Sequence, residues 1–309
     1  MKKILITGGS GLVGSYLIKN LKDDNCELRV LSRNKDAESD ATVYFWDWRK
    51  KEIEEEALKD LDVIINLAGA NIAAKLWTEE RKKEILKSRT ETLELLFEKC
   101  KALNTKPATL ISASAIGYYG NSRDLKFYTE KDRPSSDFLG SVCKEWEEKA
   151  EKFTELGTRV VKLRIGAVLA KEGGILKKLT PLFKCGLGAS LGSGTQIFSY
   201  IHIVDLIDII KFAMENEEIS GSYNAVSPEV INNFEFSRSM ANVMKRALIV
   251  PSVPAFFLKM ILGELSEMLI NGNKVSSDKI IKAGYEFKYP TIAKALVEIF
   301  QSQKTTVES

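Results

Sequence analysis

A glycine-rich segment near the amino end constrains the fold of this chain more than any other feature. The segment Thr7-Gly8-Gly9-Ser10-Gly11-Leu12-Val13-Gly14 follows a short apolar run and precedes apolar residues at helical spacing. In such a strand–loop–helix unit, the first glycine permits a tight turn and the second lets the backbone approach a diphosphate. The third lets the helix pack closely on the strand. A purely structural turn is the alternative, but this context favours a dinucleotide site at the helix N-terminus.

Strand and helix patterns alternate along the first two-thirds of the chain. Apolar runs typical of strands occupy 4–6, 28–31, 43–46, 63–67, 109–112 and 159–163, and helices are expected over 11–22, 78–103 and 138–156. This alternation predicts an α/β fold, a doubly wound parallel sheet of the Rossmann type with helices on both faces. We expect this domain to cover residues 1–166 and to be completed by about 200–227.

The pattern changes after Gly166. Six glycines between 173 and 194 predict a glycine-rich substrate loop with a short helix over 167–199. Two or three helices after Pro251 predict a small, mostly helical C-terminal lobe over 228–301. The polar residues 302–309 are expected to form a flexible tail.

The residues at the strand ends indicate which dinucleotide is bound. Ser32 and Arg33 stand where an NAD-binding chain usually places Asp or Glu for the ribose 2′-hydroxyl. An arginine pairs well with a 2′-phosphate, so the sequence favours NADP(H), with a solvated surface arginine as the alternative. Asp47 is a candidate acceptor for the adenine amino group. The small segment Leu67, Ala68 and Gly69 leaves room for the adenosine.

Charge and cysteine content exclude several function classes. The 45 basic and 42 acidic residues give a net charge of +3, which provides no electrostatic footprint for nucleic acid. Four dispersed cysteines and a single histidine offer no zinc site of the usual spacing, and no metal is expected. The sequence lacks a signal-peptide pattern and a membrane-spanning apolar run. We expect a cytoplasmic protein that binds a small-molecule substrate and neither nucleic acid nor membrane, and a homodimer is left open.

Further segments make a family resemblance specific. They are Asn66–Ala70, Ser112–Gly120, Phe138–Glu147, Leu163–Gly166, Gly192–Gln196 and Tyr200–Asp205. Together with the glycine loop they resemble the atypical, epimerase-like branch of the extended short-chain dehydrogenases/reductases, within the NAD-dependent epimerase/dehydratase superfamily. The stretch from Val253 to Pro290 is similar to this branch's C-terminal domain of unknown function. Some members of the branch are called cell-division inhibitors, and the resemblance covers nearly the whole chain.

The resemblance implies an NADP(H)-dependent oxidoreductase or epimerase acting on a small polar carbonyl or alcohol. In this superfamily a Ser–Tyr–Lys set transfers the proton, and the lysine also holds the nicotinamide ribose. Ser114 and Lys144 match the serine and the lysine, with a helix or turn cap and a solvated helix residue as their alternatives. Arg164, at the end of the sixth strand, is a further candidate cofactor contact.

The tyrosine of the set is missing. Gly140 stands four residues before Lys144, where the usual Tyr-x-x-x-Lys pair has its acid. Tyr118 and Tyr119 are candidates for proton transfer, and an aromatic pocket wall is the alternative for both. The loss keeps open a non-catalytic NADP(H)-binding sensor or regulatory protein. The resemblance to epimerases also keeps open a nucleotide-sugar epimerase.

Overall fold

The computed structural model describes residues 1–22, 24–36, 39–121 and 126–301. These residues form two compact units. The first unit comprises Met1–Tyr118, Phe138–Arg164 and Ile207–Tyr223, and the second comprises Tyr119–Asp137, Ile165–Leu206 and the chain from Asn224 onward. The expected tail at 302–309 lies outside the described residues.

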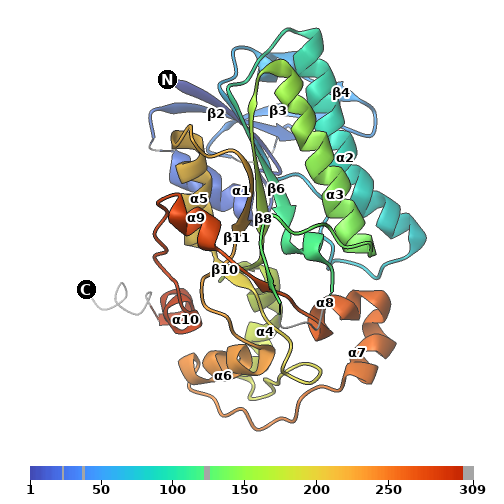
Figure 1. The fold of residues 1–309 in the computed structure, drawn as a ribbon, viewed down its shortest axis with the longest axis vertical. Helices are drawn as coiled ribbons and strands as arrows, with labels where there is room; N and C mark the ends of the chain where they lie inside the picture. The colour runs from blue at the N-terminus through green and yellow to red at the C-terminus, as the bar shows by residue number, and fades with distance from the viewer. Residues whose placement is uncertain (23, 37–38, 122–125, 302–309) are drawn as a thin grey trace. The chain divides into compact units, whose positions relative to one another are not determined.

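An eight-stranded sheet organises the first unit (Figure 1). In spatial order its strands are β11 (Gly221–Ala225), β8 (Arg159–Ile165), β6 (Thr109–Ala115), β5 (Val63–Asn66), β1 (Lys2–Thr7), β2 (Cys26–Ser32), β3 (Thr42–Asp47) and β4 (Glu52–Ile53). The central strands pair in parallel, and the two-residue edge strand β4 runs antiparallel to β3. The predicted Rossmann-type parallel sheet is confirmed.

Helices cover both faces of this sheet. On one face α2 (Glu79–Ala102) packs beside α3 (Phe138–Glu151), which continues as the 3-10 helix η3 (Lys152–Leu156) (Figure 1). On the other face lies α1 (Leu12–Leu21), and Asp24 after it pairs with Lys211 of α5 (Ile203–Glu215) at 2.8 Å. Because both faces are covered, the strands β1, β5 and β6 are almost wholly buried.

A chain of buried side chains joins three neighbouring strands. The hydroxyl of Thr7 on β1 donates to the side-chain oxygen of Asn66 on β5 at 2.7 Å. The Asn66 amide in turn donates to the hydroxyl of Ser112 on β6 at 3.1 Å. Thr7 also accepts the N–H of Ala68 at 3.2 Å. These bonds satisfy polar groups that would be costly to bury alone, and they link the carboxyl ends of β1 and β5 to the middle of β6.

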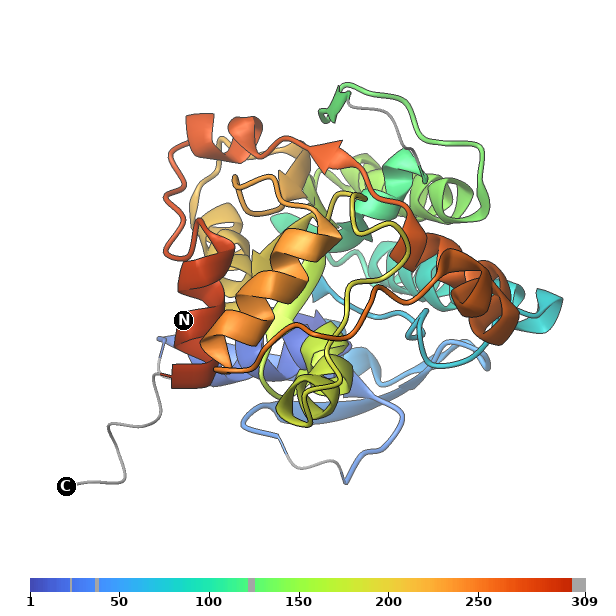
Figure 2. The same ribbon diagram turned by 90° about the horizontal axis from the view of Figure 1, so that it is seen from below.

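The second unit has its own apolar core. Here β9 (Ala167–Ala170) pairs in parallel with β10 (Tyr200–His202), and α4 (Gly174–Lys184) packs on β9. Figure 2 shows α6 (Asn233–Val243) beside α10 (Ile292–Gln301), and the core includes Phe183, Phe236 and Leu296. The segment 167–199 therefore holds a strand that the glycine-rich sequence did not indicate, besides the short helix that was expected.

The C-terminal part of the second unit is divided more finely than expected. It contains α7 (Ala255–Leu262), the 3-10 helix η4 (Gly263–Ser266), α8 (Glu267–Ile270), β12 (Lys274–Val275), α9 (Asp278–Lys282) and α10, and β12 pairs with β7 (Phe127–Tyr128). The prediction of two or three helices after Pro251 was wrong, because the described residues contain four α-helices there. Two of them, α8 and α9, have four and five residues, too few to show helical periodicity.

Two buried side chains tie this part together. The carboxylate of Asp205 accepts hydrogen bonds from the Tyr285 hydroxyl and from the N–H groups of Lys288 and Tyr289. His202 is fully buried, accepts the N–H of Val204 at 3.2 Å and contacts the Glu298 carboxylate at 2.9 Å. Burial lowers the pKa of His202 to about 4, so its imidazole is neutral at pH 7.

Candidate functional site

The glycine loop between β1 and α1 is built so that side chains cannot replace Gly8 or Gly14. Gly8 has a φ of +73°, and a Cβ there would lie 2.7 Å from the Leu67 carbonyl oxygen. A Cβ on Gly14 would lie 2.3 Å from the carbonyl oxygen of Gly8. Gly11 is the N-cap of α1 and provides no side-chain cap, so the first N–H groups of this ten-residue helix remain available to an anion.

A cavity of about 780 Å³ in the first unit adjoins this loop. Eight of the predicted cofactor-binding residues line it, and they are Gly8, Ser10, Gly11, Ser32, Arg33, Leu67, Ala68 and Gly69. They come from the ends of β1, β2 and β5, which meet at the carboxyl edge where parallel sheets bind ligands. The tight glycine cradle and the cavity size fit the diphosphate and adenosine of a dinucleotide.

The other predicted cofactor residues have different positions. Thr7, Gly9, Leu12, Val13 and Gly14 are not among the lining residues and belong to the strand, turn and helix that shape the loop. Asp47 does not line the cavity either, and its carboxylate accepts the N–H of Arg49 at 3.0 Å. Arg33 is exposed and its guanidinium makes no hydrogen bond or ion pair with any described residue.

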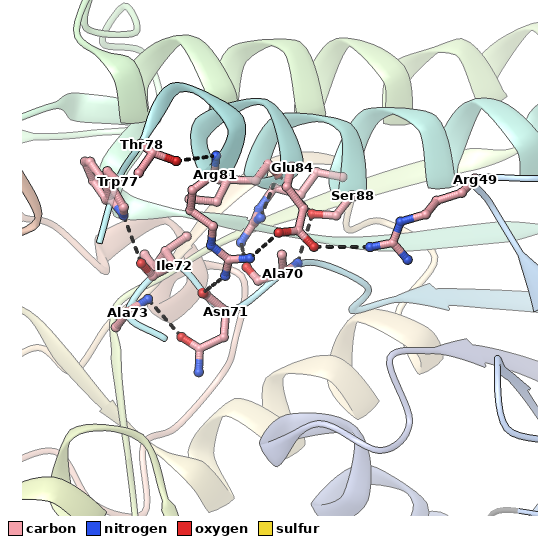
Figure 3. Close-up of polar contacts among 12 residues, drawn as sticks. Arg49, Ala70, Asn71, Ile72, Ala73, Trp77, Thr78, Arg81, Glu84 and Ser88 are labelled. Atoms are coloured by element: carbon pink, nitrogen blue, oxygen red, sulfur yellow. Dashed lines mark hydrogen bonds and ion pairs between the residues drawn. The ribbon is translucent and has the colours of Figure 1, made fainter. Parts of the chain in front are cut away.

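Polar residues on α2 and after β3 complete the wall of the cavity (Figure 3). Glu84 contacts Arg81 at 2.5 Å and Arg49 at 3.1 Å. The Arg81 side chain is 9% exposed and also donates to the backbone carbonyl of Asn71. Its hydrogen bond with Glu84 lowers the pKa of that carboxyl, so Glu84 is ionised at neutral pH. This network fixes the segment after β5 against the helix.

A second polar cluster, also within the first unit, surrounds Ser114 at the end of β6. The Ser114 hydroxyl donates to a carboxylate oxygen of Glu147 on α3 at 2.8 Å. The same carboxylate binds Arg164 on β8 through two hydrogen bonds of 2.8 and 2.9 Å. All three residues are buried. The single proton of Ser114 is therefore held by Glu147.

The two adjacent tyrosines have different surroundings. Tyr118 is half-buried, its ring centroid lies 3.4 Å from the Arg164 guanidinium carbon, and burial raises the pKa of its hydroxyl. Tyr119 belongs to the second unit, where it is 3% exposed and donates to the Asn224 side-chain oxygen at 2.7 Å. The hydroxyl proton of Tyr119 is thus used to hold the fold.

Comparison with known proteins places the chain in a family. Residues 4–226 match the NAD dependent epimerase/dehydratase family, and residues 253–299 match a domain of unknown function, DUF1731. The chain belongs to the NAD dependent epimerase/dehydratase family. The resemblance predicted from the sequence is confirmed, including its C-terminal module.

Individual relatives show which proteins this epimerase family member resembles. It is 35% identical over 301 residues to an epimerase family protein of Staphylococcus aureus strain N315, covering 97% of this chain and all of the relative. Its structure resembles the crystal structure of human epimerase family protein SDR39U1 with NADPH, with a TM-score of 0.86, 29% identity and coverage of 97% and 99% of the two chains. A nucleoside-diphosphate sugar epimerase from Corynebacterium glutamicum aligns with a TM-score of 0.77 and 29% identity, over 97% of this chain and 58% of that one. The family description names NAD, and the human relative was crystallised with NADPH.

On the helix α3 of this epimerase family member, Lys144 and the residues that contact Ser114 have different positions. Lys144 is exposed and contacts Glu148 on its own helix at 3.7 Å. The α3 residues that contact Ser114 are Cys143 and Glu147, and burial raises the pKa of the Cys143 thiol to about 12. The structure thus brings Ser114 together with Glu147 and Cys143, and it directs Lys144 to the exposed side of α3.

Sequence reasoning missed several residues of the site. Arg81 and Glu84 stand among many charges on α2, so nothing distinguished them from a solvated helix face. Arg49 lies just past the end of β3, next to the strand that ends at Ser32. The rule that neighbouring parallel strands end at one ligand-binding edge could have identified it.

Among the described residues, no group of three or more His, Cys, Asp or Glu side chains could hold a metal ion, and no helix is long and apolar enough to cross a bilayer.

Proposed function

We propose that this chain is an NADP(H)-dependent oxidoreductase or epimerase-type enzyme that acts on a small polar carbonyl or alcohol. The observation that carries the proposal is the cavity that has the glycine loop at one end and the unpaired Arg33 guanidinium after β2. A guanidinium at this position pairs with a 2′-phosphate, whereas NAD-binding chains use a carboxylate for the 2′-hydroxyl. The human relative crystallised with NADPH supports the same choice.

The residues of the chain have separate roles in this proposal. The amides of the glycine loop bind the diphosphate, and the small residues Ala68 and Gly69 admit the adenosine ribose. The dinucleotide, when bound, supplies or accepts a hydride. The role of Lys144 at the nicotinamide ribose stays a prediction; its ammonium group is exposed and lies 3.7 Å from Glu148.

Tyr118 is the proton donor or acceptor in the proposal. It follows the carboxyl end of β6, at the sheet edge that also carries the glycine loop. Burial raises the pKa of its hydroxyl, so the group is protonated at neutral pH and can donate to a substrate oxygen. Glu147 and Arg164 position it: Arg164 lies against the ring, and Glu147 fixes Arg164.

Two measurements test the proposal. Calorimetric titration with NADPH and NADH should give clearly tighter binding of NADPH, and Arg33→Ala should reduce the difference. Equal binding of both nucleotides by the unmodified chain would remove the assignment to NADP(H). A screen of pooled carbonyl compounds and nucleotide sugars should then find turnover that Tyr118→Phe lowers at least about 100-fold, the usual contribution of a positioned acid. Turnover that survives Tyr118→Phe would overturn the catalytic assignment.

A second candidate function is a non-catalytic NADP(H)-binding sensor. It is favoured by Gly140 in place of the usual tyrosine and by the Ser114 proton that Glu147 holds. Tight binding of NADPH without turnover of any compound in the screen would support the sensor. Turnover of a nucleotide sugar would instead support a sugar epimerase. Cytoplasmic location and a homodimer stay predictions.

A further inference from the structure

Arg49 occupies a defined position in the wall of the nucleotide cavity. It follows the end of β3, and its guanidinium carbon lies 4.6 Å from the centroid of the Trp48 ring. One amino group of the same guanidinium lies 3.1 Å from the Glu84 carboxylate. Figure 3 shows this contact as a dashed line. An aromatic ring and a carboxylate on two sides restrict the rotamers of an arginine that is otherwise 44% exposed.

Glu84 is itself held in place. Its other carboxylate oxygen binds Arg81 at 2.5 Å, and Arg81 is almost wholly buried and donates to the Asn71 carbonyl. The carboxylate therefore connects the buried Arg81 to the half-exposed Arg49 and orients Arg49 from the neighbouring helix. Because Glu84 lies between two guanidinium groups, its charge is balanced within the network.

The cavity carries more positive charge than one phosphate contact requires. Its lining has four basic residues, Arg33, Arg49, Lys75 and Arg81, and one acidic residue, Glu84, a net charge of +3. The strands β2 and β3 are parallel neighbours, paired from Arg29–Thr42 to Ser32–Phe45, so both strands run toward the same edge of the sheet. Arg33 and Arg49 both follow these ends and both line the cavity.

We propose that Arg49 is a second recognition residue for the 2′-phosphate of NADP(H), acting with Arg33 and positioned by Glu84. This proposal rests on the proposed function, since it concerns the phosphate that distinguishes NADP(H) from NAD(H). A phosphate monoester is close to a dianion at neutral pH, and one guanidinium balances only half of that charge. The contact with Glu84 uses one amino group of Arg49 and leaves other N–H donors of its planar fork for phosphate oxygens.

The experiment measures binding of NADPH, NADH and adenosine 2′,5′-bisphosphate by calorimetry at fixed ionic strength. Arg49→Ala should weaken the binding of NADPH and of the bisphosphate about tenfold or more, as expected for loss of a charged hydrogen bond. It should change the affinity for NADH less than about threefold. Lys50→Ala removes an equal charge one residue away, from a side chain outside the cavity lining, and should change neither nucleotide. If Arg49→Ala and Lys50→Ala weaken NADPH binding equally, Arg49 acts only as a distant positive charge, and the proposal is overturned.

A double variant separates a direct contact from an indirect one. Arg49→Ala also leaves the Glu84 charge less balanced, and that charge alone would repel a phosphate. In Arg49→Ala/Glu84→Gln this repulsion is removed, so a persistent loss of NADPH affinity supports the contact and full recovery contradicts it. The Arg33→Ala variant distinguishes the two proposals. If Arg33→Ala removes the NADPH preference and Arg49→Ala does not, the proposed function stands and the role of Arg49 fails.

Discussion

The carboxylate of Glu147 and the guanidinium of Arg164 form a buried ion pair in which two parallel hydrogen bonds of 2.8 and 2.9 Å join the groups. Their side chains are 9% and 3% exposed. Ser114 and Ser222 donate to the same carboxylate, at 2.8 and 3.2 Å. The pair thus joins α3 to β8, and its carboxylate also accepts the hydrogen bond of the Ser114 hydroxyl.

Removal of one partner of this pair should be costly. Glu147→Leu leaves the Arg164 charge buried without compensation, and we expect the free energy of unfolding to fall by about 3–5 kcal/mol. Urea denaturation followed by circular dichroism measures the change. The double variant Glu147→Leu/Arg164→Met removes both charges and should regain most of the loss. A double variant as unstable as the single one would show that the unpaired charge is not the cause.

The glycine loop predicts a contrast between two alanine substitutions. Gly14→Ala forces a Cβ to within 2.3 Å of a backbone oxygen, so stability should fall by about 1–3 kcal/mol and NADPH binding should weaken. Gly11 has an ordinary φ of −78°, and a Cβ there would lie 3.2 Å from its nearest neighbour. Gly11→Ala should therefore change stability by less than about 1 kcal/mol and still weaken NADPH binding, because its backbone approaches the diphosphate. Thermal unfolding and a nucleotide titration on both variants check the contrast, and normal binding by Gly11→Ala would contradict it.

The neighbouring tyrosines should respond differently to the loss of a hydroxyl. Tyr119→Phe leaves the buried Asn224 oxygen without its donor, and we expect a loss of about 1–3 kcal/mol in unfolding free energy. Tyr118→Phe keeps the ring against Arg164 and removes a hydroxyl hydrogen bond with Arg164 at a half-exposed position, where the loss should be less than about 1 kcal/mol. Urea titrations of the two variants under one set of conditions decide the matter; equal losses would contradict the separate roles assigned here.

His202 should make stability depend on pH. Its folded pKa of about 4 lies below the ordinary value of 6.5, so protons bind the unfolded chain more readily. The stability from neutral His202 is present above pH 6.5 and is lost as the pH falls toward 4, by up to about 3 kcal/mol. Burial raises the pKa of Glu298, which has the opposite effect and offsets part of this loss.

Comparison with a His202→Gln variant isolates the histidine contribution. Unfolding free energies measured at pH 7, 6, 5 and 4 should fall more steeply in the unmodified chain than in the variant. The chain has no other histidine, so the difference between the two curves comes from His202 and its contact Glu298. Parallel curves would contradict the assignment.

The sequence was sufficient for the sheet and for the nucleotide-binding end of the site. Apolar runs and helical spacing are local patterns, and the glycine loop connects a strand to a helix within eight residues. The polar clusters were not predictable in this way. Glu147 and Arg164 are 17 residues apart on a helix and a strand, and only the packing of α3 on the sheet brings them together.

Side-chain direction on a single element was equally hard to predict. Tyr118 and Tyr119 are adjacent and identical in type, and the turn of the 3-10 helix η2 (Ile116–Tyr119) gives them separate environments. Cys143 and Lys144 are also adjacent, and a rotation of about 100° along α3 directs one to Ser114 and the other to the exposed side. A sequence match to a family lysine does not fix that rotation.

The hydrogen-bonded chain Thr7–Asn66–Ser112 has a thermodynamic consequence for ligand capture. It fixes Thr7 and Asn66, from which the glycine loop and the Leu67–Gly69 segment start, before any nucleotide binds. Little backbone entropy therefore remains to be lost on association. A substitution at Ser112, two strands away from the loop, should therefore weaken nucleotide binding, because the unliganded loop would sample more conformations and lose more entropy on association.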